Sequence, residues 1–221
     1  VWPGTHTVVV PNPDLKPEKS LNYEAGSSFK ADGVFGSDDH LFAKAVFFYD
    51  DVKDFIAPKG WFEPTTPPTV YYSSQNVGHV VRKGIELSGT YAAGQFSTSV
   101  SYGLLHAVDK ETNERMNGIT PQSANLKLAY AFPAQAINVW YRAHWSKGGE
   151  SSVEDRATGK NLHFSSFLTH SLGAEWSPKV ADLANLQAGI AVVNLFDKEY
   201  RMLNGSYGSG RGVRLWLSAQ F

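Results

Sequence analysis

Hydrophobic and polar positions alternate along most of this chain, and the last ten residues show the pattern most clearly. Apolar side chains occupy every second position from Val213 to Phe221, and polar or amphipathic side chains occupy the positions between, from Arg214 to Gln220. Successive side chains of an extended strand point to opposite faces. The pattern therefore predicts a strand with one wholly apolar face and one polar face, as in a strand between lipid and a wet interior.

The same alternation predicts nine strands along the chain. They lie at about 21–30, 41–56, 70–92, 96–104, 125–132, 137–145, 168–176, 186–200 and 212–221. Residues 1–17, rich in Pro, Thr and Val, are predicted to form an outer loop segment, and residues 18–221 to form the strands. Residues 57–69 contain four prolines, which lack a backbone donor, so this stretch is predicted to be a loop rather than a central strand.

Short turns and long loops alternate between these strands. The short turns lie around Asp32, Gly94, Pro133 and Ala181, and the long loops around Pro64, Asn113, Asp155 and Gly208. Aromatic residues gather near the strand ends, where amphipathic rings settle at a boundary between water and lipid. A soluble β-sandwich offers no reason for this segregation of loop lengths. The fold class predicted is therefore all-β, an antiparallel transmembrane β-barrel of the bacterial outer membrane.

Nine is an odd number of strands, and single-chain bacterial barrels have an even number. An open sheet edge in lipid would leave backbone amides unpaired, so these strands are expected to close with others. The first residue is Val1 rather than Met, which agrees with a piece of a longer protein. We therefore expect a C-terminal part of a larger barrel.

The composition removes several classes of function. The net charge of -1 gives no indication of a nucleic-acid partner, and the absence of cysteine excludes disulfides and thiolate metal sites. No run of about 18 apolar residues suggests a transmembrane helix. The sequence also shows no nucleophile with its base, phosphate loop or closed metal-ligand cluster, so no enzyme is predicted.

Three stretches of the chain resemble the TonB-dependent outer-membrane receptors. They read NPDLKPE at 12–18 followed by YEAG at 23–26, NVG and KGIE within 72–86, and VNLFDKEY at 193–200. The box residues that carry the resemblance are Asn12, Pro13, Asp14, Leu15, Asn194, Leu195 and Phe196, and the terminal Phe221 resembles the assembly signal of outer-membrane barrels. The order and spacing agree over nearly the whole chain.

The resemblance implies a barrel of about 22 strands, of which these are the last nine, and a plug domain that the chain lacks. It implies active import of a scarce ligand, usually an iron chelate, powered by the TonB complex. No intrinsic cofactor is implied, because haem or a ferric siderophore is the transported ligand. The barrel-assembly machinery and outer-membrane lipid are the other implied partners.

One histidine bears on the choice of ligand. Haem receptors of this family carry a histidine in an outer loop just upstream of an Asn-Pro-Asn/Asp-Leu box, and His6 matches that position. A neutral imidazole is a good axial ligand for haem iron. Haem, free or from a carrier protein, is therefore the favoured ligand, with a ferric siderophore, another ligand or a passive porin as alternatives. A solvated loop histidine is the plainer interpretation of His6.

The remaining candidates have plainer explanations. Tyr71 and Tyr72 are possible outer-loop contacts with the ligand, although positions at the water-lipid boundary suit them better. Asp50, Asp51 and Asp54 suggest a cation site only weakly, because polar strand ends need no ion. Five side chains are expected to point into the barrel and to form plug contacts or ion pairs, namely Arg82, Arg142, His144, Glu175 and Arg214.

Overall fold

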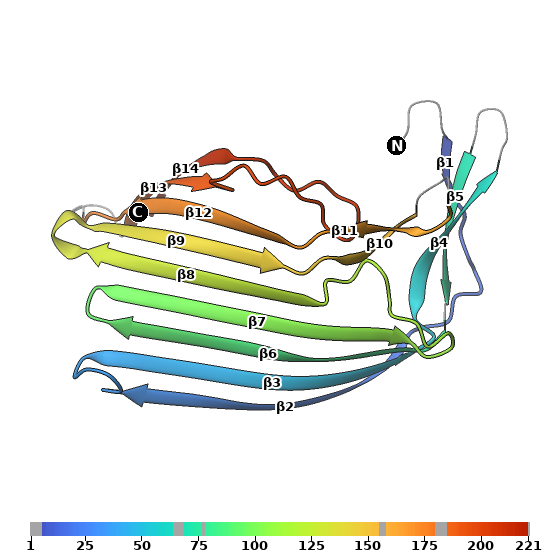
Figure 1. Ribbon diagram of the computed structural model, residues 1–221, viewed down its shortest axis with the longest axis horizontal. Helices are drawn as coiled ribbons and strands as arrows, with labels where there is room; N and C mark the ends of the chain where they lie inside the picture. The colour runs from blue at the N-terminus through green and yellow to red at the C-terminus, as the bar shows by residue number, and fades with distance from the viewer. Residues whose placement is uncertain (1–5, 64–68, 77, 155–157, 180–184, 221) are drawn as a thin grey trace. The chain divides into compact units, whose positions relative to one another are not determined.

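The computed structural model describes residues 6–63, 69–76, 78–154, 158–179 and 185–220 (Figure 1). Contacts divide the chain into two units. The first comprises residues 1–24, 48–83 and 107–116, and the second comprises residues 25–47, 84–106 and 117–221. Within the described residues, no helix is both long and apolar enough to cross a membrane.

The main element is a sheet of nine strands, in the number predicted. Its order is β14-β13-β12-β9-β8-β7-β6-β3-β2, and neighbouring strands from β7 to β14 run antiparallel. The strands are β2 (Lys19–Asp32), β3 (Asp39–Lys53), β6 (Val80–Ala93), β7 (Phe96–Asp109), β8 (Gln122–Phe132), β9 (Ile137–Ser146), β12 (Phe167–Trp176), β13 (Asn185–Val193) and β14 (Gly212–Gln220). The predicted antiparallel β fold is confirmed.

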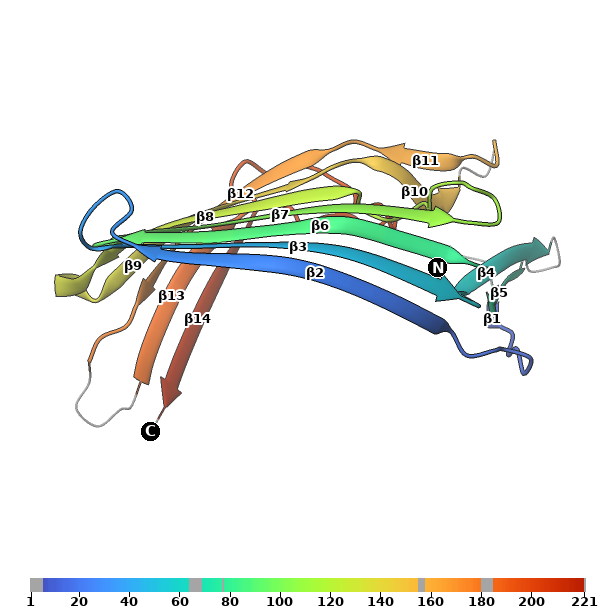
Figure 2. The same ribbon diagram turned by 90° about the horizontal axis from the view of Figure 1, so that it is seen from below.

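The two faces of this sheet differ in chemistry in the second unit. Val213, Leu215 and Leu217 of β14 are 63–75% exposed on one side, which we call the apolar face. Leu215 lies opposite Ile190 in the neighbouring β13, and Figure 2 shows these two strands side by side. Because opposite residues share a face, the apolar side chains form continuous rows across the strands. The predicted alternation is therefore present in the sheet and not only in single strands.

The opposite side, which we call the polar face, contains a small core of tryptophans packed over glycines. Trp140 in β9 lies opposite Gly173 in β12, and Trp216 in β14 lies opposite Gly189 in β13. Trp140 is 8% exposed and clusters with two buried alanines, with Trp216 packed against them. A glycine has no β-carbon, so each indole lies directly on the neighbouring backbone. Each indole thus fills the space over a glycine that would otherwise be a cavity on the polar face.

The first unit contains a separate three-stranded sheet in the order β1-β5-β4. These strands are β1 (His6–Val9), β4 (Ile56–Glu63) and β5 (Thr69–Asn76). The sheet corrects two predictions, because residues 57–69 are not all loop and 70–92 is not one strand. Pro58 is tolerated because β4 is an edge strand of this sheet. Gly78, with φ of +104°, separates β5 from β6.

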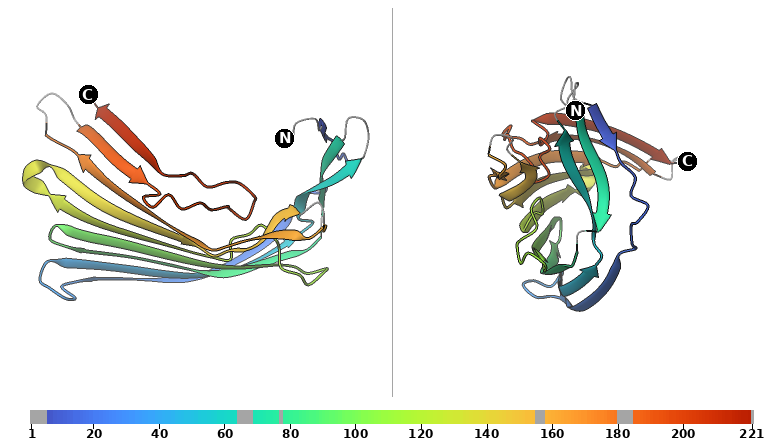
Figure 3. Two further views of the ribbon diagram at one scale, coloured as in Figure 1. Left: turned by 45° about the horizontal axis from the view of Figure 1, so that its top comes forward. Right: turned by 90° about the vertical axis from the view of Figure 1, so that its right-hand side faces the viewer.

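A second small sheet lies in the predicted long loop after β9. The strands β10 (Gly149–Glu154) and β11 (Asn161–Phe164) pair antiparallel as a hairpin. The predicted strand at 186–200 ends at Val193, and a long connection then runs to β14 (Figure 3). A single 3-10 turn, η1 (Pro133–Gln135), joins β8 to β9. The connections therefore contain more regular secondary structure than the alternation of hydrophobic and polar residues predicted.

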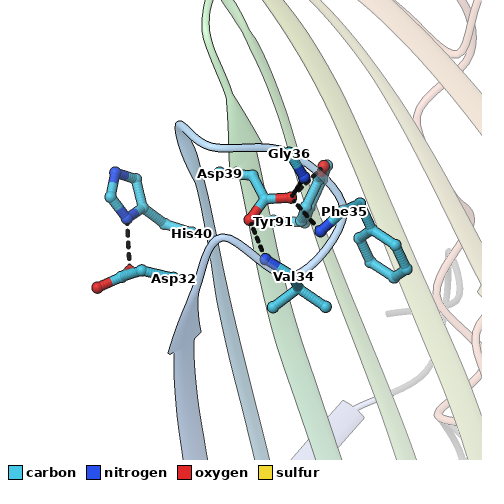
Figure 4. A network of polar contacts seen from close by, with 7 residues as sticks. All are labelled: Asp32, Val34, Phe35, Gly36, Asp39, His40 and Tyr91. Atoms are coloured by element: carbon cyan, nitrogen blue, oxygen red, sulfur yellow. Dashed lines mark hydrogen bonds and ion pairs between the residues drawn. The ribbon is translucent and has the colours of Figure 1, made fainter.

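The short turn between β2 and β3 is held by one carboxylate (Figure 4). Asp39 is 1% exposed and accepts hydrogen bonds from the backbone N–H groups of Val34, Phe35 and Gly36, at 2.7, 2.7 and 2.9 Å. The Tyr91 hydroxyl of β6 donates a fourth, at 3.0 Å. The carboxylate thus closes its own turn and ties that turn to a tyrosine near the end of another strand.

Asp39 lies at the turn end of β3, which has 15 residues where a membrane-spanning strand needs about 9–11. Burial alone raises the pKa of its carboxyl, but the four hydrogen bonds outweigh burial and hold the pKa below its usual value. A lowered pKa in the folded state stabilises the fold at pH values above the usual pKa of aspartate. This contribution is lost as the pH falls through the lowered value.

The packing of Trp140 predicts that Gly173 cannot be enlarged without cost. A β-carbon at Gly173 would lie 2.4 Å from Trp140 Cζ2 and 2.9 Å from the carbonyl oxygen of Ile190. We expect Gly173→Ala to lower the free energy of unfolding by about 1–3 kcal/mol, as for other overpacked sites. Urea unfolding of the intact protein in detergent, followed by tryptophan fluorescence, measures the change.

The matched control is Gly103→Ala, on the polar face of β7. Its new β-carbon would meet nothing closer than Ser123 Oγ at 3.8 Å, which is ordinary contact. We expect this variant to change the free energy of unfolding by less than about 0.5 kcal/mol. Equal losses in the two variants would contradict the packing of Trp140 described above.

Candidate ligand-binding site

The predicted haem ligand His6 begins strand β1. Its backbone pairs in parallel with β5, where His6 lies opposite Thr69. The side chain of His6 lies outside the part of the chain that the structure describes. Its role as a ligand therefore stays a prediction, and the only correction concerns the backbone, which forms a strand within the predicted loop 1–17.

Tyr71 and Tyr72 lie in β5, the central strand of the three-stranded sheet. Tyr71 is half-buried, opposite Val8 on one side and Trp61 on the other. The Tyr72 side chain is outside the described residues, although its backbone lies opposite Val9. The structure therefore places Tyr71 within a sheet, and a contact of either tyrosine with ligand stays a prediction.

The first family box folds as a turn fastened to β5. The Asn12 side-chain Nδ2 donates to the carbonyl oxygen of Ser74 at 3.0 Å, and its Oδ1 accepts from the backbone N–H of Asp14 at 3.1 Å. Pro13 and Asp14 form the turn itself, and Leu15 after it is half-buried. Asn12 thus uses both ends of its amide to position the backbone.

Asn76, at the end of β5, completes the fastening. Its Oδ1 accepts from the backbone N–H of Lys16 at 2.9 Å, and its Nδ2 donates to the carbonyl oxygens of Lys16 and Asp54, at 2.9 and 2.6 Å. Glu18 Oε1 accepts from the backbone N–H of Ile56 at 2.6 Å. The polar side chains of Asn12, Asn76 and Glu18 therefore hold residues 12–18 against β5 and the start of β4.

The second family box also folds as a turn. Asn194 is 5% exposed and has φ of +48°, a backbone conformation that asparagine tolerates better than most residues. Its Nδ2 donates to the carbonyl oxygens of Lys198 and Ser209, both at 2.9 Å, and its Oδ1 accepts from the Lys198 N–H at 2.9 Å. Asp197 Oδ1 accepts from the backbone N–H of Arg211 at 2.7 Å. Asn194 therefore links the beginning of the connection between β13 and β14 to its end.

The other two residues of this box join an aromatic cluster. The Leu195 N–H donates to the carbonyl oxygen of His170 at 2.7 Å, and the exposed Phe196 ring meets the His170 ring edge-on at 5.0 Å. His170 Nδ1 lies 2.5 Å from the Tyr141 hydroxyl. His170 and Tyr141 belong to the apolar face, so this cluster suits the water-lipid boundary at the long-loop ends of the strands.

A pocket of about 710 Å³ lies between the β11–β12 connection and the connection from β13 to β14. Four aromatic residues line it, namely Phe164, Phe167, Tyr200 and Tyr207. The rings of Phe167 and Tyr200 are stacked at 4.1 Å, and Phe167 also lies 5.8 Å from the ring of His144 on the polar face. A volume of this order is typical of small-molecule sites. The contact between Phe167 and His144 places the pocket at the long-loop end of the polar face.

Ionisable side chains of both signs line this pocket, namely His163, Asp197, Lys198, Glu199 and Arg201. His163 Nδ1 lies 3.0 Å from Glu150 Oε1, across the β10–β11 hairpin. The Arg201 guanidinium lies 3.9 Å from the centre of the Tyr207 ring and 5.6 Å from that of Phe164, and it also contacts the Tyr207 hydroxyl. Sequence reasoning missed His163, Glu150 and Arg201. The Leu162-His163-Phe164 alternation was a signal, but it lay between the predicted polar loop and the predicted strand at 168–176.

A larger hollow of about 960 Å³ lies elsewhere on the second unit. Its lining includes Leu87, Val100, Leu126 and Leu168, all of the apolar face. Such a surface belongs against hydrocarbon rather than against a polar ligand. The smaller pocket therefore has the more suitable chemistry for a polar or charged ligand.

Several side chains expected inside the barrel lie on the polar face. The guanidinium of Arg142 lies 5.2 Å from the centre of the Trp140 ring, and His144 Nδ1 lies 2.8 Å from Asn125 Oδ1. Glu175 and Arg214 lie in register with polar-face positions of their neighbouring strands, opposite Gly189 and Ala191. The Arg142 contact lies within β9, and the His144 contact joins β9 to β8.

The acidic residues near the end of β3 are accounted for by ion pairs and turns. Asp50, 6% exposed, pairs with Arg82, and Asp51 Oδ1 lies 2.8 Å from His79 Nε2. Asp54 has φ of +54° and offers its backbone carbonyl to Asn76. Among the described residues, no group of three His, Cys, Asp or Glu side chains is placed to hold a metal ion.

Comparison with protein families decides which class the chain belongs to. The family model described as "TonB dependent receptor-like, beta-barrel" matches residues 2–195, most of the chain. The chain belongs to this TonB-dependent receptor family. The resemblance stated from the three boxes is therefore confirmed, and so are the fold class and the outer-membrane location. The apolar face is accordingly the lipid-facing side of the sheet.

Relatives of this TonB-dependent receptor chain carry names of receptors and transporters. "Heme/hemopexin utilization protein C" of Haemophilus influenzae is 25% identical over 210 residues, covering 93% of this chain and 29% of that protein. "Hemin receptor" of Yersinia pestis is 24% identical over 215 residues, covering 96% and 30%. The FrpB iron transporter of Neisseria meningitidis has a TM-score of 0.66 at 21% identity, covering 94% and 31%. The chain thus spans under a third of the length of these proteins.

The fastening of residues 12–18 by Asn76 can be tested by hydrogen exchange. The Asn76→Ala variant loses the acceptor for the Lys16 N–H and the donor to two carbonyl oxygens. We expect the amide of Lys16 in the intact receptor to exchange at least about tenfold faster, because local opening then costs less. Mass spectrometry of peptides covering 12–18 measures this, with β8 as the internal control. Unchanged exchange in 12–18 would contradict the fastening.

The turn of the second box gives a stability prediction. Asn194→Ala leaves buried partners unpaired and places alanine at a positive φ, so we expect the receptor to lose at least about 2 kcal/mol of unfolding free energy. Asn204→Ala, an exposed asparagine of the same connection with one local bond of 3.0 Å, is the control, with a loss under about 0.5 kcal/mol. Urea unfolding measures both variants. Lost ligand binding with unchanged stability would instead make Asn194 a ligand contact.

Proposed function

We propose that this chain forms the C-terminal part of the barrel wall of a receptor that imports haem across the bacterial outer membrane. The observation that carries the proposal is that relatives matching more than nine-tenths of the chain are named for haem or haemin. The match of His6 to the outer-loop histidine of haem receptors supports it. The structure supports the wall itself, with an apolar face toward lipid and a polar face toward the ligand path.

The partners follow from this proposal. Energy comes from the TonB complex, which contacts a portion of the receptor outside this chain. The barrel-assembly machinery inserts the strands, with Phe221 as its signal, and lipid surrounds the apolar face. Haem reaches the long outer loops either free or from a carrier protein. The receptor keeps no cofactor of its own and is not an enzyme, because haem passes through it unchanged.

The proposal predicts a haem complex that depends on His6. Titrating haemin into the purified full-length receptor should give the Soret band of histidine-ligated haem, and His6→Ala should shift this band and weaken binding at least about tenfold. Absorption spectroscopy measures both. If the wild-type receptor binds no haemin but binds a ferric siderophore, the receptor class stands and the haem proposal is wrong. Binding of neither, with free diffusion of small solutes, would favour a passive porin.

His40 provides the control for this experiment. It is an exposed histidine whose Nδ1 lies 2.6 Å from Asp32 Oδ1, at the short turn between β2 and β3 (Figure 4). This turn is at the opposite end of the strands from the long loops. We therefore expect His40→Ala to leave the haemin spectrum and affinity unchanged. A change as large as that of His6→Ala would show unspecific ligation by surface histidines.

A further inference from the structure

We propose that the pocket between the β11–β12 connection and the connection from β13 to β14 binds an iron porphyrin, with His163 as an iron ligand. This inference rests on the proposed function for the identity of the ligand. It goes beyond that function by assigning a second histidine and a binding surface formed by loops other than the segment that contains His6.

A carboxylate orients the His163 imidazole. Its Nδ1 lies 3.0 Å from Glu150 Oε1, and the two residues are directly opposite each other in the β10–β11 hairpin. With Nδ1 donating to the carboxylate, Nε2 carries the lone pair and is left as the ligand atom. A carboxylate behind a histidine is the arrangement that orients metal-binding imidazoles and raises their basicity. The side chain is 65% exposed, so Nε2 is accessible to a ligand.

Aromatic rings line the pocket beside His163. Phe164 follows it directly, and the stacked pair of Phe167 and Tyr200 lines the same pocket. The Tyr200 ring lies flat on Gly208, where a β-carbon would fall 2.1 Å from the ring. These rings are therefore fixed by packing before any ligand arrives. A flat, largely apolar macrocycle is a ligand that such surfaces bind well.

The pocket also contains positive charge that a ligand can use. A porphyrin of the haem type carries two carboxylate side groups, which need cations or N–H donors at the edge of the pocket. Arg201 is held over the Tyr207 ring at 3.9 Å and lines the pocket together with Lys198, and the carboxylates of Asp197 and Glu199 line it too. Across the residues that the structure describes, Arg201 makes no ion pair with a carboxylate of the protein. Its charge is therefore available to a ligand carboxylate.

The two sides of the pocket approach each other closely at Leu203, and the hairpin side is braced by a backbone hydrogen bond. Leu203, in the connection from β13 to β14, is 5% exposed, and its Cδ1 lies 3.8 Å from the position of a β-carbon on Gly149 in β10. The Gly118 N–H donates to the carbonyl oxygen of Glu150 at 2.9 Å and braces the same hairpin. The pocket is thus preformed, which reduces the entropy lost on binding.

The test uses the full-length receptor with two probes, haemin and metal-free protoporphyrin. We expect His163→Ala to weaken haemin binding at least about tenfold and to shift the Soret band, while metal-free protoporphyrin binds as before, because only iron needs the imidazole. We expect Arg201→Gln to weaken both probes, because both carry the carboxylates. Glu150→Gln should shift the haemin spectrum in the same direction as His163→Ala but by less. His40→Ala is the control and should change neither probe.

The same titrations in the His6→Ala background separate this site from the one proposed above. The His6→Ala receptor should keep residual histidine-ligated haemin, and the His6→Ala/His163→Ala receptor should lose it. If the double variant binds haemin like His6→Ala alone, the assignment of His163 is wrong and the haem receptor proposal stands. If the wild-type receptor binds no haemin at all, the proposed function fails and this assignment fails with it.

Discussion

Backbone hydrogen bonding is the constraint on which the rest of this structure depends. In lipid no water is present to pair with exposed amides, so each strand must be bonded to neighbours on both sides. The continuous registers from β7 through β14 provide this pairing. Once the register is fixed, the period of two assigns every side chain to lipid or to the interior. A shift of one residue would put Arg214 into hydrocarbon and Leu215 into water.

The same constraint explains what the family boxes do. Strands of a barrel are regular, but the chain must leave the sheet, make a loop and return in the correct register. Asn12 and Asn76 hold residues 12–18 at β5, and Asn194 closes the connection from β13 to β14. Asparagine suits this role because one amide both donates and accepts, and because it tolerates a positive φ. The motifs that carry the family resemblance are here part of the scaffold that positions the loops.

The sequence predicted the long strands well because lipid imposes a strict alternation on them. It predicted the loops poorly, because no such alternation acts there. β4 was missed because Pro58 argues against a central strand. Proline is permitted at the edge of a sheet, but the edge position of β4 depends on the tertiary structure. β10 lay inside a stretch that looked polar, and β11 is a strand of four residues between that stretch and the next predicted strand. The pocket at His163 could not be predicted, because Glu150, Phe167 and Tyr200 come together only through the folding of separate loops. The role of His6 came from resemblance and stays a prediction.

The central claim is that the nine strands are the wall of a transmembrane barrel, with one face toward lipid and the other toward a wet interior. Nitroxide labels placed one at a time along β8 in the full-length receptor, reconstituted in vesicles, test it directly. Labels at Leu126 and Leu128 should be relaxed by oxygen, and labels at Asn125 and Lys127 by a water-soluble nickel chelate, alternating with period two. Equal access of the chelate to both sets of positions would contradict the account.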